Sequence, residues 1–505
     1  MNALLTPPPA RILTAILLVQ TAAAAAGAPA DQYPVDQNAV IVEARRLASS
    51  PYAASTGNLP AGLDRLSADQ YRNIRFSESA SIWKSDNLPF TVGLLPAGFY
   101  FQLPVRIALV DSGVSHELVT TPGMFELGAN MPAALNKIAL PMSGFTLRSH
   151  LNSRTSRDEF MRFQGASYFR ALAKGQIYGL SARGLAINIA EPMGEEFPAF
   201  TRFWIEKPAP DAENIVVHAL LDSPSVTGAY QFIVQPGNET SVDVDVTLFA
   251  RTPLRALGLA PLTSMFLYDE TNRNRRDDYR PEVHDSDGLQ ITSASGEPIW
   301  RPLANPVKLQ MSAFTTEAPR GFGLMQRSRS AIDYQDMDSQ YERRPSVWVE
   351  PKSDWGPGAV ELVELPTSRE TNDNITAFWR PAAAIAPGKP WHIAYRLTWN
   401  AQPRPPKGLG RVVATRAGSS ADGGRRVYMI DFTGSGEKID GLRVDLSASA
   451  GKTSNLTLVP NPTVHGFRVG FELDSNNADV IELRLRVLQG NRPISETWLY
   501  RWTAS

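Results

Sequence analysis

The sequence contains no cysteine among its 505 residues. This absence excludes disulfide bonds, thiolate metal sites, iron–sulfur ligation and cysteine nucleophiles at once. The chain also lacks a surplus of basic charge, because 50 lysines and arginines stand against 51 aspartates and glutamates. Binding of nucleic acid through bulk charge is therefore disfavoured, which leaves only a local basic patch for such a role.

Long apolar runs are absent after the first thirty residues, where no window approaches the ~20 apolar residues of a membrane-spanning helix. Residues 1–30 carry Arg11 as their only charged side chain, then the apolar run Ile12–Leu18, an alanine tract and small residues before Asp31. This order is typical of a secretory signal peptide, and no Arg-Arg pair precedes the apolar run. We expect cleavage of a Sec-type signal; a single membrane anchor, the alternative, is disfavoured by the short, alanine-rich run.

Two segments have the periodicity of amphipathic helices. Apolar residues recur at helical spacing within residues 38–48, where Asn38 can cap the first turn. A second helix is predicted to begin at Ser156, because Ser156 and Glu159 have the spacing of a capping box and phenylalanines follow. Both helices are expected at the margins of a fold that is mainly β.

Strand signals dominate from about residue 200 onwards. The segment 242–248 alternates valine or leucine with polar residues, which is the period of a half-buried strand. Apolar runs of similar length, bounded by Pro, Gly or Ser, occur at 200–206, 215–221 and 229–234. A stripe of period two at 391–399 is the expected closing strand of a first domain.

A break in composition divides the chain after this stripe. The segment 402–408, with sequence QPRPPKG, does not fit the interior of a strand or helix. Short alternating runs follow it at 427–433, 442–448, 454–459, 466–474, 480–489 and 496–502. We therefore predict a large β-sandwich over 31–400, a linker at 401–410 and a small immunoglobulin-like sandwich over 411–505.

The usual hydrolase motifs are missing. None of the six histidines forms an HExxH pair or another close ligand spacing, and neither a GxSxG elbow nor a P-loop occurs. Zinc and serine hydrolases of the common kinds are therefore poorly supported, and neither a metal nor another cofactor is predicted.

The segment 279–289, with sequence YRPEVHDSDGL, concentrates polar chemistry on a loop framed by Pro and Gly. Glu282, Asp285 and Asp287 place three carboxylates around a histidine. A calcium loop of the EF-hand type is disfavoured, because Gly296 occupies the position where that loop has a glutamate. A solvated turn stays open as the simpler interpretation, since Asp and Ser favour turns.

Sequence context favours a sugar-cleaving site over a plain turn. A second acidic cluster holds Glu361, Glu364, Glu370 and Asp373, and aromatic residues accumulate around both clusters. Aromatic faces beside arginines and carboxylates suit sugar rings, although each aromatic alone is more commonly a core residue. Glycosidic cleavage needs one acid to protonate the leaving oxygen and a second carboxylate to help generate the nucleophile.

Long motifs then identify a family. They include FQGASYFRA (163–171), YRPEVHDSDGL (279–289), YERRPSVWVEPKSDWGPGAVELVELP (341–366) and ETNDNITAFW (370–379). These strings closely resemble the periplasmic glucan biosynthesis proteins, the OpgG/OpgD (MdoG) family, over essentially the whole chain after the signal. The resemblance implies a periplasmic protein that acts in making osmoregulated glucans with a β-1,2-linked backbone.

The resemblance also implies a fold and an activity. The expected fold is a large galactose-mutarotase-like β-sandwich with a cleft, joined to a small immunoglobulin-like β-sandwich. Some members of the family are inverting endo-β-1,2-glucanases and others are transglycosylases, and the resemblance allows a homodimer. A non-catalytic glucan-binding or scaffolding subunit that works with the inner-membrane glucan synthase is the alternative.

The family's functional residues carry over by motif. Asp373 corresponds to the general acid and Asp285 to the general base, which acts through a substrate hydroxyl and water, while Tyr341 belongs to the proton-relay network. As an acid, Asp373 must hold a proton near neutral pH, which requires burial or a nearby carboxylate such as Glu370 or Glu364. Further sugar contacts are expected at Asp287, Glu282, Arg280, Trp300, Arg301, Arg343, Arg344, Trp348 and Trp355. For the adjacent Arg343 and Arg344, a structural ion pair is the alternative.

Two departures from the family pattern concern the cleft. Pro298 stands where the family usually has an aromatic residue, and Ser330-Ala331 replaces an acidic-aromatic pair. Neither change touches Asp285 or Asp373, so both bear on a binding subsite rather than on the acid and base. The motifs are mixed between the OpgG and OpgD subtypes, and the sequence leaves the subtype open.

Overall fold

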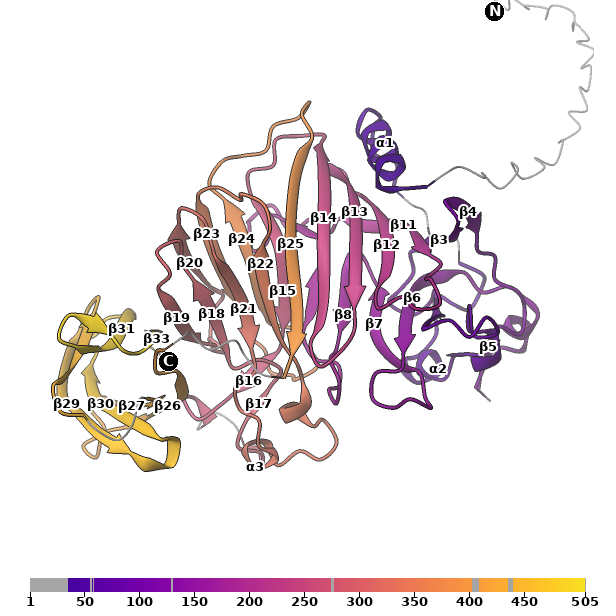
Figure 1. The fold of residues 1–505 in the computed structure, drawn as a ribbon. Helices are drawn as coiled ribbons and strands as arrows, with labels where there is room; N and C mark the ends of the chain where they lie inside the picture. Colours follow the sequence, from indigo (N-terminus) through magenta and orange to yellow (C-terminus); the bar gives the residue numbers. More distant parts are fainter. Residues whose placement is uncertain are drawn as a thin grey trace, which may run out of the picture.

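The computed structural model describes residues 35–54, 57, 59–128, 130–273, 277–401, 408–434 and 439–504. The signal peptide predicted for 1–30 and most of the predicted linker, residues 402–407, lie outside this part of the chain. Within it the protein is mainly β, as predicted, and strands fill most of the ribbon in Figure 1. Helices are few and short: α1 (Gln37–Ala48), α2 (Ala68–Arg72) and α3 (Ala331–Tyr334).

Among the described residues, two large sheets form the first domain. One contains, in spatial order, β4 (Val114–Glu117), β3 (Arg106–Asp111), β11 (Ala199–Glu206), β12 (Ile215–Asp222), β13 (Val226–Gln235), β14 (Thr240–Ala250), β25 (Trp391–Asn400), β22 (Ser346–Pro351), β21 (Gly321–Met325), β18 (Gly288–Thr292) and β19 (Pro298–Pro302). The other contains β2 (Phe90–Pro96), β6 (Met142–Ser149), β7 (Asp158–Gln164), β8 (Tyr168–Ala171), β9 (Ser181–Arg183), β15 (Leu257–Ser264), β24 (Ile375–Pro381), β23 (Gly358–Glu364) and β20 (Gln310–Thr316), with β10 (Leu185–Ile187) beside β15. Short pairs outside these sheets are β1 (Arg75–Phe76) with β5 (Phe125–Glu126), and β16 (Phe266–Tyr268) with β17 (Val283–His284).

The two sheets face each other as the layers of a sandwich (Figure 1). Phe163 on β7 lies 5.5 Å from Phe203 on β11 and 5.2 Å from Phe232 on β13, measured between ring centroids. Edge-to-face contacts of this kind add to the area that each ring buries. The phenylalanines of both inner faces therefore make one continuous core.

The strands predicted from period-two alternation are confirmed. In β14 the residues Val242, Val244, Val246 and Leu248 are buried, whereas the aspartates between them are partly exposed. The runs predicted at 200–206, 215–221, 229–234 and 391–399 correspond to β11, β12, β13 and β25. Alternation of apolar and polar residues was a reliable signal here, because these strands have one buried face and one partly exposed face.

The helix predicted from Ser156 is wrong. Residues 158–164 form β7, whose Phe163 pairs with Phe145 of β6 and with Phe169 of β8. The spacing of Ser156 and Glu159 resembles a capping box, but sheet pairing on both sides and burial of the phenylalanines outweigh that local preference.

The N-terminal helix is confirmed, with a different cap. Helix α1 begins at Gln37, and the Asp36 carboxylate accepts a hydrogen bond of 2.9 Å from the Ala39 N–H, so Asp36 rather than Asn38 is the cap. Val40 and Ala44 are buried in a cluster with Trp204, on the outer face of the first sheet. The helix thus covers apolar side chains of the first sheet that do not belong to the core between the two sheets.

A smaller module follows the predicted linker. Its strands are β26 (Val412–Ser419), β27 (Arg426–Thr433), β28 (Leu442–Ala448), β29 (Lys452–Asn461), β30 (Gly466–Asp474), β31 (Val480–Gln489), β32 (Arg492–Pro493) and β33 (Thr497–Thr503). Within the described residues the order is β26-β27-β30-β29 in one sheet and β28-β31-β33 in the other, which is the order of strands in constant-type immunoglobulin domains. An immunoglobulin-like identity and the boundary at 401–410 stay predictions.

The small module is joined to the sandwich by more than the connecting chain. Strand β33 pairs in parallel with β19, so that one sheet continues from the large domain into the small module. Behind this pairing Arg327 Nη2 lies 2.8 Å from Glu496 Oε1, and both side chains are buried. The Arg327 guanidinium also lies 3.5 Å from the ring centroid of Trp300. A buried ion pair therefore stabilises the junction between the two domains. The small module is coloured yellow in Figure 1.

Replacement of Glu496 by glutamine is expected to lower the free energy of unfolding by about 3–5 kcal/mol, because the buried Arg327 guanidinium then loses its ion-pair partner. Glutamine keeps the volume and can still accept the hydrogen bond from the Val412 N–H. Glu43→Gln is the matched control, since Glu43 pairs with Arg46 at the surface and its loss should change little. Denaturant titration measures both variants; equal losses would contradict the assignment.

Candidate active site

Asp285 stands at the end of a short strand pair that fixes its backbone. Strand β17 ends at His284, and the Asp285 N–H donates a hydrogen bond of 2.8 Å to the carbonyl of Met265, just before β16. The Asp285 side chain is 6% exposed. The carboxylate is therefore held in a fixed direction within a largely dry site.

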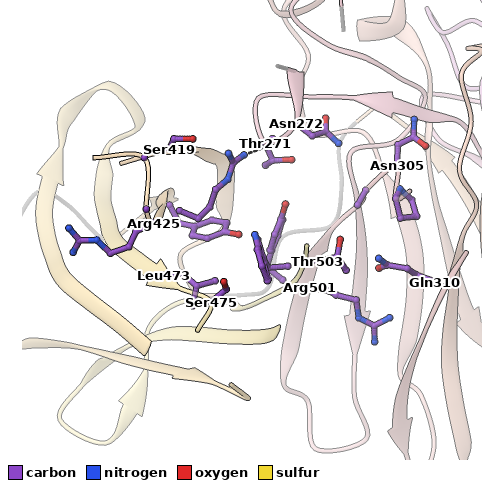
Figure 2. Close-up of a pocket in the computed structure, with 18 residues that line it drawn as sticks. Thr271, Asn272, Asn305, Gln310, Ser419, Arg425, Leu473, Ser475, Arg501 and Thr503 are labelled. Carbon is purple, nitrogen blue, oxygen red and sulfur yellow. Dashed lines mark hydrogen bonds between the residues drawn. The ribbon is translucent and has the colours of Figure 1, made fainter. Parts of the chain in front are cut away.

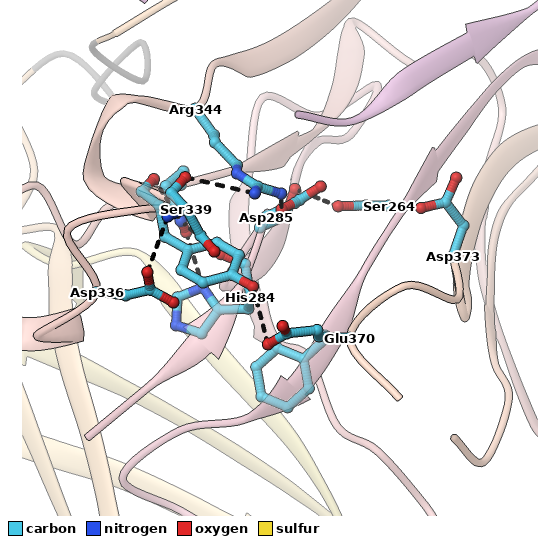
Figure 3. A network of polar contacts seen from close by, with 12 residues as sticks. Ser264, His284, Asp285, Asp336, Ser339, Arg344, Glu370 and Asp373 are labelled. Atoms are coloured by element: carbon cyan, nitrogen blue, oxygen red, sulfur yellow. Dashed lines mark hydrogen bonds and ion pairs between the residues drawn. The ribbon is translucent and has the colours of Figure 1, made fainter. Parts of the chain in front are cut away.

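Arg344 contacts the Asp285 carboxylate directly. Its guanidinium forms an ion pair with Asp285 and lies 4.2 Å from the ring centroid of Tyr341. The Tyr341 hydroxyl in turn donates to Glu370 Oε2 at 3.3 Å. Figure 3 shows Arg344, Asp285 and Glu370 in one polar network. The motifs at 285, 341–344 and 370 thus meet in space.

Asp373 lies in the turn between β23 and β24, beside the same network (Figure 3). The next residue, Asn374, is buried and anchors the turn: its Oδ1 accepts from the Phe266 N–H at 2.9 Å, and its Nδ2 donates to the Leu365 carbonyl at 3.0 Å. Because Phe266 belongs to β16, this amide ties the turn of Asp373 to the strand pair that holds Asp285.

The electrostatic surroundings couple the two aspartates. Burial raises the pKa of Asp373, against the opposing charges of Arg170 and Arg344. Burial also raises the pKa of Asp285, with Arg344 lowering it and the negative charge of Asp373 raising it further. The pKa of Asp285 therefore responds to the charge of Asp373, and Arg344 acts on both carboxyl groups.

Of the two expected causes of a raised pKa at Asp373, burial is confirmed, and the nearby carboxylates Glu364 and Glu370 are not the cause. Glu364 is fully buried and lies 3.2 Å from Arg301, and Glu370 lies 2.7 Å from Arg280. Each glutamate thus forms an ion pair with an arginine. The pKa of Asp373 is raised by burial rather than by either of them.

A groove of about 440 Å³ opens beside Asp373. Its walls include Arg162, Tyr168, Arg170 and Tyr178 from the second sheet and its loops. Arg170 Nη2 lies 3.7 Å from Asp373 Oδ2. Aromatic faces beside guanidinium donors are chemistry that suits a sugar chain.

A loop with exposed aromatic residues borders this groove. Tyr100 is 83% exposed and, with Phe101, lines both the groove and a neighbouring hollow of about 170 Å³. Sequence reasoning did not single out Tyr100, Arg162 or Tyr178, because no pattern of charged or polar residues marked their segments. Arg170 lay within a quoted family motif, but no chemical pattern marked it.

Arg280 is a structural clamp in this structure. Its guanidinium contacts Asp278 at 2.9 Å, Asp336 at 2.7 Å and Glu370 at 2.7 Å. All three contacts are to protein carboxylates, so Arg280 joins three loops around the site. A sugar contact, as predicted for Arg280, would have to compete with them.

Glu282 and Asp287 face away from the Asp373 groove. They line a separate hollow of about 130 Å³ toward the small module, together with Trp300. Asp287 Oδ2 accepts the backbone N–H groups of Arg327 at 2.7 Å and Ser328 at 3.1 Å. Both side chains therefore support the loop from behind rather than border the groove.

Four further residues predicted as sugar contacts lie in the protein interior. Trp300 and Trp348 belong to the hydrophobic cluster of the small module, and Trp355 packs against Trp379 in the sandwich. Arg301 is 1% exposed because it pairs with Glu364. Little of these side chains is available to a ligand. The remaining one, Arg343, is exposed and donates to the Gly175 carbonyl at 3.2 Å.

Two further features of the described residues concern metal-binding groups and membrane-spanning helices. No group of three or more His, Asp and Glu side chains among them is arranged to hold a metal ion. No helix in the described part of the chain is long and apolar enough to cross a membrane.

The raised pKa of Asp373 predicts how stability responds to pH. The charged form disfavours the folded state, so the penalty appears as the pH rises through the folded-state pKa. Asp373→Asn is therefore expected to raise the thermal midpoint at pH 7. The gain should vanish at acidic pH, where the carboxyl group is protonated in both states.

Asp278→Asn is the matched control with the opposite sign. Hydrogen bonds from the Arg280 side chain lower the pKa of Asp278 to about 2, so its charged form stabilises the folded state. This variant should melt lower at pH 7, and the deficit should fade as the pH falls from ~4 toward the folded-state value. Thermal melts across pH that move both variants in the same direction would refute the assignment.

Comparison with known proteins places the chain in a family. A family model described as "Periplasmic glucan biosynthesis protein, MdoG" matches residues 35–502. "Glucans biosynthesis protein G" of Shewanella sp. (strain W3-18-1) is 47% identical over 472 residues, 93% of this chain and 87% of the relative. The protein of the same name from Vibrio cholerae serotype O1 (strain M66-2) is 48% identical over 473 residues, with the same coverage of 93% and 87%.

Solved structures give a weaker likeness. A galactose mutarotase related enzyme from Lactobacillus acidophilus covers 52% of this chain and 91% of its own, at 11% sequence identity and a TM-score of 0.22. At that score the likeness carries no argument, so the mutarotase-like fold stays a prediction. The family match does not depend on it: the chain belongs to the periplasmic glucan biosynthesis protein family, MdoG.

Proposed function

We propose that this protein cleaves or transfers β-1,2-glucan in the periplasm by an inverting acid–base mechanism. Membership of its family supports a role in periplasmic glucan biosynthesis. The periplasmic location agrees with the family description and with the Sec-type signal predicted over residues 1–30. The β-1,2 linkage, the cleavage or transfer reaction, and the roles of Asp373 and Asp285 are what we propose beyond the family role.

The observation that carries the proposal is the meeting of Asp285 and Asp373 in one electrostatic network beside a groove. The two residues come from loops far apart in the chain, yet the charge of Asp373 raises the pKa of Asp285. Arg344 acts on both carboxyl groups. A pair of interacting carboxyl groups at a groove is the arrangement that glycosidic cleavage uses.

Asp373 suits the role of general acid. Its raised pKa favours the protonated form, and about a third of its side chain remains accessible from the groove. Arg170, at 3.7 Å, is the main charge that opposes protonation, and burial outweighs it. A proton held there can pass to the oxygen of a departing sugar.

Asp285 suits the base side of the reaction. The Arg344 guanidinium contacts the Asp285 carboxylate directly and favours its ionised form, against burial and the charge of Asp373, which both raise the pKa of Asp285. Because Asp285 is buried, it would act through a relay, and the Tyr341 hydroxyl with a water and a substrate hydroxyl could supply one. The usual spacing of ~6.5–9.5 Å between the carboxyl groups of an inverting enzyme is not required for such a relay.

A second candidate function has one observation in its favour. Arg344 contacts the Asp285 carboxylate, whose side chain is 6% exposed and does not line the groove beside Asp373. A protein that binds glucan without turnover, and guides it for an inner-membrane synthase or as a homodimer, does not need this carboxylate to reach the groove. Binding of β-1,2-glucan without shortening of the polymer would favour this alternative.

Asp373→Asn and Asp285→Asn should each lower the rate of product release from purified linear β-1,2-glucan by about 10²–10⁴-fold, because each removes a proton-transfer group. Asp211→Asn is the control, since Asp211 is exposed on a loop far along the chain from both motifs. Chromatography of the products measures all three variants. Undiminished product release by both active-site variants would remove the assignment.

Tyr341→Phe tests the relay separately. Loss of the hydroxyl removes a proton carrier but leaves the ring under Arg344, so kcat should fall by at least about tenfold while KM changes little. Tyr279→Phe is the matched control, because Tyr279 is 76% exposed. A rise in KM with an unchanged kcat would instead make Tyr341 a simple binding residue.

A further inference from the structure

A second hollow, separate from the Asp373 groove, lies between the large domain and the small module. It encloses about 290 Å³, near the lower end of the range for small-molecule sites. Figure 2 shows side chains of both modules around it, with Asn305 and Gln310 on one side and Ser419 and Ser475 on the other. We call it the inter-module groove. None of its lining residues borders Asp373.

Two arginines in the wall of this groove hold the modules in register. Arg426 Nη2 donates to the Thr271 carbonyl at 2.7 Å, and Arg501 Nη1 donates to the Met311 carbonyl at 2.8 Å. Both hydrogen bonds cross from the small module to the large domain. The groove is therefore a formed feature of the junction, since its two walls are linked at both arginines.

The charges around the groove are nearly balanced. Its described lining contains no carboxylate, but Arg425 pairs with Asp422 and Glu472 just outside it, and Arg501 pairs with Glu482. An anionic ligand would thus meet two guanidinium groups that are already neutralised, and a third, that of Arg426, which donates to the Thr271 carbonyl. Strong binding of a free phosphate is not what this arrangement favours.

The lining offers both hydrogen-bond donors and acceptors. Gln310 contributes an amide, and Ser419, Ser475 and Thr503 contribute hydroxyl groups. Trp502 on β33, partly buried, adds an aromatic face. A ligand that alternates hydroxyl groups with C–H faces matches this mixture, because hydroxyls need both kinds of partner and C–H faces pack on rings.

We propose that the inter-module groove binds a segment of a neutral glucan chain, as a second saccharide site remote from Asp373. The choice of glucan as the ligand rests on the function proposed above. A chain long enough to occupy both sites would be held by two contacts at once, so its retention would exceed that of either site alone. The small module thereby becomes part of the ligand-binding surface.

The test uses the full chain and linear β-1,2-glucan in native affinity gels, with Asp373→Asn as background so that the polymer is not consumed. Adding Gln310→Leu and Ser475→Leu removes polar partners and narrows the groove without adding a ring. We expect about a tenfold weaker retention by long glucan. Ser447→Leu, on the exposed face of β28, is the matched control and should retain glucan normally.

Other measurements separate the possible outcomes. In the otherwise unchanged protein, the groove substitutions should leave cleavage of short β-1,2-gluco-oligosaccharides unaltered, since they lie apart from Asp373. Equal retention by groove and control variants, at equal melting temperatures, would overturn the proposal. Stabilisation of the protein by inorganic phosphate, lost in the groove variant and not produced by glucan, would overturn it in favour of an anion site.

The test also keeps this proposal apart from the catalytic one. If Asp373→Asn leaves product release unchanged but the groove substitutions weaken retention, the catalytic assignment fails and the groove stands. Should the double substitution impair folding, Ser419→Leu at the exposed rim carries the same expectation.

Discussion

The buried amide of Asn374 is the contact on which the candidate site depends. It joins the turn of Asp373 to β16 through the Phe266 N–H, while β16 and β17 together fix the backbone of Asp285. Pairing of Ser264 with Ile375 between β15 and β24, and the contact of Arg280 with Glu370, join the same two loops. Because a buried amide that loses its partners costs free energy, the bridge through Asn374 also resists being opened. The distance between the acid and the base therefore depends on this amide together with those contacts.

Arginine–carboxylate pairing is the second recurring theme. Arg280, Arg301, Arg327 and Arg344 each form an ion pair with a carboxylate in or near the candidate site and the module junction. Such pairs satisfy charges that burial would otherwise penalise, and they add direction through the planar guanidinium. The near-zero net charge of the chain fits this use: basic residues serve the protein's own acids rather than an external polyanion.

The sequence predicted the β content, several strands and the N-terminal helix, because alternation and helical spacing report burial directly. It failed at β7, where a local capping pattern was stronger than any sign of the sheet partners on either side. It also could not tell groove from core among the tryptophans: Trp300, Trp348 and Trp355 share their neighbourhood with the site in sequence but point into the interior. Arg170 and Tyr178 border the groove, but no chemical pattern in their segments marks them, so only the fold connects them to Asp373.

The parallel pairing of β33 with β19 has a consequence for how the molecule comes into being. Among the described strands β33 is the latest in chain order, yet it continues a sheet whose other members come from the large domain. While the chain is being synthesised or translocated, the edge of β19 stays unpaired until β33 becomes available. The small module therefore completes the large sheet. Until it does, the exposed edge of β19 is the place where misassembly or chaperone binding is expected.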